Sequence, residues 1–196
     1  MSNPPTLRAG VRGRTRRAIL GAAASVLARD RAATLADIAD AADVGRSTLH
    51  RYFPDRQELI DAVIEDSLRA LGQAVEEAAL DQGPPLEAMR RLVAAMVDVG
   101  DRLLFLFGDP RVLEGREEPA PSDRPVSDLI ERGQGQGVFD PEVGAEWIEH
   151  VLWALVYTAA EEVGTGRLPR HGVTATVIRT FENGIRTRPP GQGSRP

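Results

Sequence analysis

The chain has 196 residues, a formal net charge of −5 and 42% hydrophobic residues. This length and composition are typical of a globular protein with one large domain or two small helical ones. The absence of cysteine excludes a disulfide framework and thiolate chemistry. No apolar run approaches the roughly 18 residues of a membrane span, and no apolar signal core follows the basic N-terminus, so we expect a cytoplasmic protein.

Charge is divided unevenly along the chain. Residues 1–60 hold 10 arginines and 6 carboxylates, a net charge of +4, whereas residues 61–196 hold 14 arginines and 23 carboxylates, a net charge of −9. This asymmetry indicates a basic region suited to an acidic partner such as nucleic acid. All of the positive side chains are arginines, whose planar fork fits phosphates and guanine edges.

Apolar periodicity predicts several helices near the N-terminus. Residues 1–13 show no apolar period and are predicted to be a disordered arm. A helix follows from Arg14, with an apolar stripe formed by Ile19, Ala22, Ala23, Val26 and Leu27. Thr34 opens a second helix, and Asp37 three positions later completes a capping-box-like pair.

Two further helices follow within the first 71 residues. Asp43-Val44-Gly45 interrupts the second helix, and a short third helix is predicted from Arg46 to Tyr52. Asp55 is a suitable N-cap for a fourth helix, with Glu58 at its third position. The apolar residues of that fourth helix are Leu59, Ile60, Val63, Ile64, Leu68 and Leu71.

The rest of the chain is also predicted to be helical. The expected elements are a long helix over Leu86–Phe107, a short one near Val112, a helix over Ser122–Gln134, a loop at 133–141, an apolar helix over Glu142–Gly164, and a last helix over Gly172–Arg186. The Pro/Gly-rich residues 187–196 are predicted to be a disordered tail. Because no segment alternates at period two, the predicted fold class is all-α, with about nine helices.

Two short helices joined by a glycine-containing turn describe a helix-turn-helix, whose second helix enters the DNA major groove. In the third helix, Leu49 is expected to point to the core, with Val44 under the turn. The polar residues around it are suited to bases or phosphates. The candidate DNA-binding residues are Thr34, Gly45, Arg46, Ser47, Thr48, His50, Arg51, Tyr52 and Arg56.

Residues 34–53 resemble the DNA-binding signature of the TetR family, within a likeness that spans about residues 14–70. The matching positions are Thr34, Ile38, Ala39, Val44, Thr48, Leu49, Tyr52, Phe53 and Arg56. The resemblance implies that Tyr52 and Arg56 contact phosphates and that Phe53 packs beneath the helix-turn-helix. The chain departs from the signature at Gly45, where the family has serine, at His50, where it has tyrosine, and at Ser47, where it has glycine or proline.

The resemblance also implies a regulator, expected to be a repressor, that binds a palindromic operator as a homodimer and is released by a small-molecule effector. Residues 14–60 would form the DNA-binding domain, and residues 61–186 the domain for ligand binding and dimerisation. The last two long helices would pair with those of a second copy. Candidates for a partly apolar effector pocket are Met96, Phe105, Phe107, Trp147, Trp153 and Tyr157. The alternative for each of them is a place in the ordinary hydrophobic core.

The sequence offers less support for other functions. A helical enzyme or a small-molecule-binding protein with a merely structural N-terminal hairpin is the main alternative, but no catalytic or cofactor motif is present. Glu146 and His150 offer only two metal ligands, so we expect no metal site and no cofactor. The arginines at positions 8, 12, 14, 16 and 17 are either a DNA-contacting arm or a solvated leader.

Overall fold

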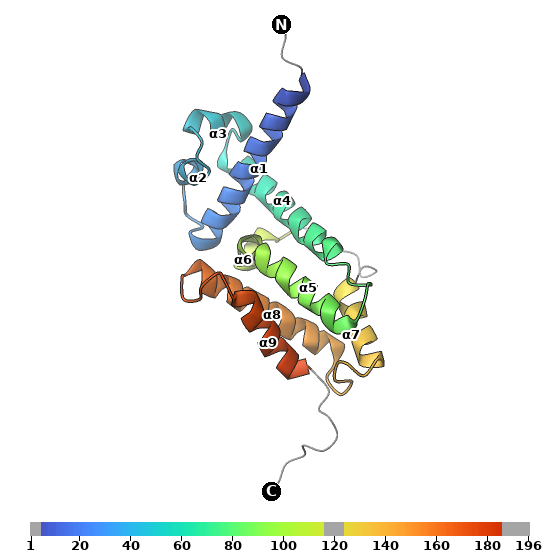
Figure 1. Cartoon of the computed structure of the whole chain (residues 1–196). Coiled ribbons are helices and arrows are strands. Elements are labelled where there is room, and N and C mark those ends of the chain that lie inside the picture. The colour runs from blue at the N-terminus through green and yellow to red at the C-terminus, as the bar shows by residue number, and fades with distance from the viewer. Residues whose placement is uncertain (1–4, 116–123, 186–196) are drawn as a thin grey trace. The chain divides into compact units, whose positions relative to one another are not determined.

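The computed structural model describes residues 5–115 and 124–185. Within these ranges the chain forms nine α-helices and one 3₁₀ helix, and no β-strand, which confirms the predicted all-α class (Figure 1). None of the described helices is long and apolar enough to cross a membrane. The predicted tail at 187–196 lies outside the described residues.

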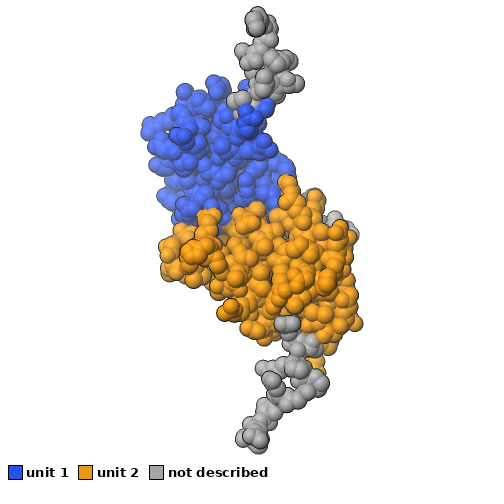
Figure 2. Space-filling model, viewed as in Figure 1, with its two compact units in different colours: residues 1–71, 101–114 blue, residues 72–100, 115–196 orange. Residues whose placement is uncertain are grey.

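The chain divides into two compact units, shown in different colours in Figure 2. Unit 1 comprises residues 1–71 and 101–114, and unit 2 comprises residues 72–100 and 115–196. Unit 1 holds α1 (Pro5–Arg29), α2 (Leu35–Ala41), α3 (Arg46–Tyr52), most of α4 (Arg56–Glu77), most of α6 (Gly100–Phe107) and the 3₁₀ helix Pro110–Val112. Unit 2 holds α5 (Pro85–Asp98), α7 (Pro125–Gly135), α8 (Ala145–Gly164) and α9 (Val173–Ile185).

The core of unit 1 joins residues that are distant in sequence. It includes side chains of α1, α2, α3 and α4, and α6 adds Phe105 and Leu106, which are 2% and 0% exposed. Burial of such large apolar side chains stabilises each by about 1.5 to 3 kcal/mol relative to exposure. The fully buried members of this core are Ile19, Leu20, Ala23, Ala24, Ile38, Ala39, Leu49, Leu59, Val63 and Leu106.

The long helix predicted over Leu86–Phe107 is wrong, because it is divided at Val99 into α5 and α6. A side chain at Gly100 would lie 2.9 Å from the Ala160 Cβ of α8, so the backbone approaches α8 closely where α5 ends. The apolar residues that follow belong to the core of unit 1 instead of continuing that of unit 2. Apolar residues continue at helical spacing through both α5 and α6, so the sequence pattern did not indicate that the two helices pack in different units.

The prediction of a disordered arm at 1–13 is wrong for residues 5–13, since α1 begins at Pro5. Proline is tolerated in the first turn of a helix, where the missing N–H has no intrahelical partner. The helix that packs through Ile19 and Leu20 therefore continues beyond its buried stripe. Residues 1–4 lie outside the described ranges.

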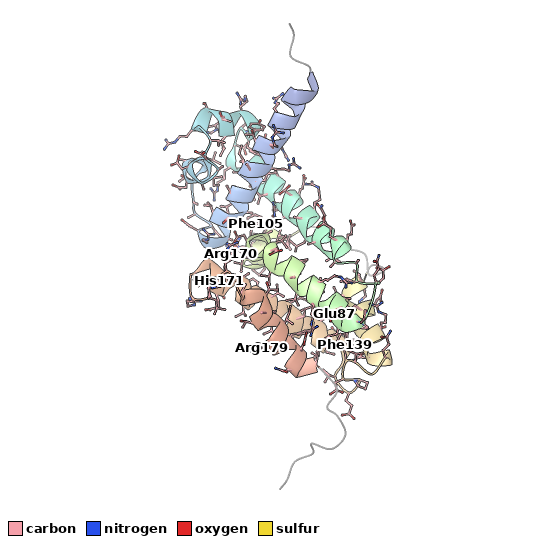
Figure 3. All side chains as sticks on the ribbon, in the orientation of Figure 1. Glu87, Phe105, Phe139, Arg170, His171 and Arg179 are labelled. Carbon is pink, nitrogen blue, oxygen red and sulfur yellow. The ribbon has the colours of Figure 1, made fainter. Side chains whose placement is uncertain are left out.

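In unit 2, α5 packs against α7, α8 and α9. Gly133 of α7 is required by this packing, because the Phe139 ring, labelled in Figure 3, lies 2.1 Å from where a Cβ at position 133 would be. Phe139 is fully buried. A bidentate ion pair also joins α5 to α9, since Arg90 donates to both carboxylate oxygens of Glu182 at 2.5 and 3.0 Å.

The predicted domain boundary at residue 60 does not coincide with the division between the two compact units. Unit 1 continues along α4 to Leu71 and includes residues 101–114 from the middle of the chain. The division of labour between a DNA-binding and a ligand-binding part stays a prediction.

Candidate nucleic-acid interface

Helix α3 has one buried side and one exposed polar side. Leu49 is fully buried in the core of unit 1, while Thr48 is half-buried. The exposed side chains are Arg46, Ser47, His50 and Arg51. Because Leu49 fixes the rotation of the helix, these donors are held on an outward surface, as a recognition helix requires.

The turn before α3 is shaped by two special positions. Asp43 has φ of +52°, a left-handed conformation that aspartate tolerates better than most residues, and the Val44 N–H donates to the Ala39 carbonyl at 3.0 Å. Gly45 is the N-cap of α3 and provides no side-chain cap. A Cβ there would have Ser47 Oγ at 3.9 Å as its nearest neighbour, so the departure from serine leaves room but removes a cap.

The N-terminus of α2 is closed by a capping box. The Asp37 N–H donates to Thr34 Oγ1 at 3.3 Å, and the Thr34 N–H and hydroxyl donate to Asp37 Oδ2 at 2.7 Å each. These bonds hold the pKa of Asp37 below its usual range, the backbone bond from Thr34 first. The Thr34 hydroxyl, expected to hold a phosphate, is thus engaged with an internal carboxylate at the same helix end.

Arg56 is committed to the loop before α2. Its guanidinium donates to the carbonyl of Ala33 and, at 2.6 Å, to that of Arg31, and its side chain is partly buried. The resemblance implied a direct phosphate contact for Arg56. Its two bonds fix the backbone from which Thr34 opens α2, and the direct phosphate contact stays a prediction.

The same loop is tied to α6 through contacts that sequence reasoning missed. Arg31 donates to the carbonyls of Phe105 and Leu104 at 3.1 and 3.4 Å. Arg102 of α6 donates to Asp66 of α4 at 2.5 Å. These partners are separated by 36 to 74 residues, so no local pattern signals them.

Aromatic residues end the recognition helix. Phe53 is 3% exposed and packs in the core of unit 1, as the resemblance implied. The Arg16 guanidinium of α1 lies 5.4 Å from the Phe53 ring centroid, and that of Arg51 lies 5.8 Å from the half-buried Tyr52 ring. Arg16 therefore joins α1 to the end of α3, a contact that its position in the sequence did not indicate.

The six aromatic and methionine residues predicted to line an effector pocket are not brought together within one unit. Phe105, labelled in Figure 3, is core of unit 1, and Phe107 of the same unit is 52% exposed. In unit 2, Met96 is buried, Trp147 is 64% exposed, and Trp153 and Tyr157 are half-buried.

Unit 2 also contains a carboxylate between α7 and α8. Glu149 accepts a hydrogen bond from the buried Ser127 hydroxyl at 2.5 Å and one from the Trp153 indole at 3.4 Å. No cationic side chain of the described ranges is paired with it. In the part of the chain that the structure describes, no three histidines or carboxylates gather as metal ligands.

The sequence is similar to a family of known proteins. Residues 19–63 match the sequence model of the bacterial regulatory proteins of the tetR family. The chain is 37% identical over 185 residues to the HTH-type transcriptional repressor LfrR of Mycolicibacterium smegmatis, covering 94% of this chain and 97% of that protein. It is 29% identical to the HTH-type transcriptional regulator NfxB of Pseudomonas aeruginosa, covering 86% and 92%.

Solved structures agree with the sequence comparison. The crystal structure of the TetR-like regulator LfrR from Mycobacterium smegmatis matches with a TM-score of 0.73 and 35% identity, and its complex with proflavine with 0.64 and 34%. Each alignment covers 91% of this chain and 99% of the other. Proteins of this kind are transcriptional regulators and not enzymes. With its capped helix-turn-helix and these full-length relatives, the chain belongs to the TetR family of transcriptional regulators.

Proposed function

We propose that the chain is a repressor that places α3 in the major groove of a palindromic operator. The observation that carries this proposal is the division of α3 between the buried Leu49 and the exposed Arg46, Ser47, His50 and Arg51. Arg46 is proposed to bond a guanine or a phosphate, and Ser47, Thr48 and His50 to contact bases or phosphates nearby. Tyr52 keeps its proposed phosphate contact, and Arg56 acts through the loop that it holds.

The test of DNA binding compares two exposed arginines. Footprinting of the purified protein on its own genome would first locate the operator. Arg46→Ala is expected to weaken operator binding and to relax specificity at one position in each half-site. Arg170→Ala, in the α8–α9 loop of unit 2 (Figure 3), removes the same charge and is expected to bind like the wild type. Unchanged operator binding by Arg46→Ala would argue against the assignment of α3.

A homodimer is proposed to form through α8 and α9. Support comes from an apolar stripe on α8, where Trp147 and Ala154 are exposed and Val151 and Leu155 are half-buried. Their spacing of four, three and one residues places them on one side of the helix. Two copies would present recognition helices about 34 to 36 Å apart, one turn of DNA.

Light scattering tests the dimer with two substitutions of the same kind. Ala154→Arg places a charge within the stripe and is expected to give a monomer at micromolar concentration. Glu131→Arg, exposed on α7, is expected to remain a dimer. A monomeric wild type would contradict the proposed dimer directly.

The effector is proposed to be a partly apolar small molecule that binds unit 2. The relative LfrR has been solved in complex with proflavine, a planar aromatic cation, which makes proflavine the first probe. Calorimetry without DNA avoids intercalation of the dye. Binding is expected for the wild type and is expected to weaken in Glu149→Gln, because the carboxylate has no cationic partner within the described ranges. No heat of binding with the wild type would exclude this class of effector.

A further inference from the structure

The N-terminal half of α1 carries positive charge without compensation. Helix α1 contains six arginines and no carboxylate. Arg12, Arg14, Arg16 and Arg17 are all exposed, and none forms an ion pair with a described residue. By contrast, Arg29 at the other end of the helix lies 3.9 Å from Asp101. The uncompensated charge is therefore confined to the first half of the helix.

Local physical chemistry disfavours this arrangement. Arg12 and Arg16 are like charges four residues apart on one helix, a spacing at which their repulsion destabilises the helix. Gly10 and Gly13 further lower the helix propensity. A stretch that departs from local preferences in this way is where a function is expected, and its unpaired cations call for an anionic partner.

The arginines of this stretch are oriented relative to the recognition helix by one contact. The guanidinium of Arg16 lies 5.4 Å from the ring centroid of Phe53, which is the C-cap of α3. Arg12 is one turn earlier on the same side of α1, about 6 Å farther along the helix axis. In Figure 1 the N-terminal turns of α1 run on past α3. The two side chains therefore form a row that starts at α3 and continues away from it.

We propose that Arg12 and Arg16 form a second DNA-contacting row, which binds backbone phosphates flanking the bases that face α3. The duplex carries one negative charge per about 1.7 Å of its axis, so a row of cations along a helix meets phosphates whatever the sequence. The row supplies affinity and no base specificity. This inference rests on the proposed DNA binding by α3.

Arg14 provides a matched control within the same helix. It lies two residues from both Arg12 and Arg16, about 200° around the helix axis, and so on the opposite side. Its guanidinium lies back along α1, 3.7 Å from the position that a Cβ at Gly10 would occupy. Replacing Arg14 changes the net charge as much as replacing Arg12 but leaves the row intact.

The experiment is a salt-dependent binding titration of the full chain on a labelled duplex that holds the footprinted operator and its flanks. In the proposed homodimer Arg12→Gln removes two phosphate contacts, one from each subunit. It is therefore expected to weaken binding about 60-fold at about 0.1 M salt and to lower the slope of log K against log salt by about 1.8. The same loss is expected on a nonspecific duplex. Arg14→Gln is expected to change binding less than twofold, with the slope unchanged.

Two further measurements sharpen the outcome. Arg16→Gln is expected to show the Arg12→Gln losses, and its thermal unfolding separates this effect from the loss of its Phe53 contact. Trimming the flanks from the duplex should remove the difference in affinity between the wild type and Arg12→Gln. If the wild type binds the operator while Arg12→Gln binds equally well, or Arg14→Gln loses as much, the row is refuted and the role of α3 stands. If the wild type binds no DNA, both proposals fail.

Discussion

Units 1 and 2 use their polar side chains differently. In unit 1, Arg56 bonds carbonyls of the loop before α2 and Arg31 of that loop bonds carbonyls of α6, while the arginines of α3 and early α1 remain exposed. In unit 2, Arg90 joins α5 to α9 and Arg132 donates to the carbonyls of Leu80 and Asp81. Unit 1 thus combines a fixed frame with an unpaired basic surface, whereas the described charged contacts of unit 2 join its own elements.

This contrast explains why the two units differ in what their sequences reveal. The residues that match the tetR family model, 19–63, all lie in unit 1. A surface that reads DNA constrains neighbouring residues on short helices, and such residues form a local pattern. A core of long helices tolerates many volume-conserving combinations of apolar residues. No residue of unit 2 lies within the range that matches the family model, and the candidate pocket residues are divided between the two units.

The largest expected effect is a loss of stability when the buried side of α3, but not its exposed side, is changed. Leu49→Ala removes a fully buried side chain and is expected to lower the free energy of unfolding by about 2 to 5 kcal/mol. Urea denaturation measures the change. Ser47→Ala, on the exposed side, is expected to change stability by less than about 0.5 kcal/mol while weakening operator binding. Equal stability losses in the two variants would contradict the division of the helix.

The next effect tests the packing of unit 2. Gly133→Ala places a Cβ within the Phe139 ring and is expected to cost about 1 to 3 kcal/mol of unfolding free energy. Gly135→Ala is the control, because no atom lies within 4 Å of a Cβ at that end of α7. If the two variants melt at the same temperature, Phe139 does not restrict position 133.

A loss of stability of similar size distinguishes positioning from direct contact at Arg56. Arg56→Ala removes two charged hydrogen bonds to loop carbonyls and is expected to cost about 1 to 3 kcal/mol of stability. Operator binding should weaken with the salt slope unchanged, because no phosphate contact is lost. A slope reduced by about 1.8, the contribution of one phosphate contact in each subunit, would restore the direct contact that the family resemblance implied. Arg56→Lys, which lacks the planar fork, should only partly recover stability.

The smallest effect is a pH dependence at the capping box. Bonds from Thr34 lower the pKa of Asp37, so its ionised form stabilises the folded chain above the ordinary aspartate pKa of about 3.9. The stability difference between wild type and Asp37→Ala should be constant from neutral pH to about pH 5 and shrink as the pH falls below about 4. Asp40→Ala, exposed on the same helix, corrects for the change in net charge. A difference that grows on acidification would contradict the capping role.

Much of the helical framework follows from the sequence alone. Helix α3 has the predicted bounds, and the Glu58 N–H donates to Asp55 at 2.9 Å, as the predicted cap of α4 requires. The capping box of Thr34 and Asp37 was also predictable. These features depend on periodicity and on hydrogen bonds between residues three or four apart, and such information is contained in a short stretch of sequence.

The tertiary structure decided what depends on distant partners. It divided the predicted helix at Val99 and packed Phe105 in unit 1, and it directed Arg56 to the Ala33 carbonyl. It also placed Arg16 of α1 over Phe53, so that the uncompensated arginines of α1 start at the recognition helix. Local patterns fix which residues face inward, but the neighbour that each residue meets is fixed only when helices separated in the chain pack together.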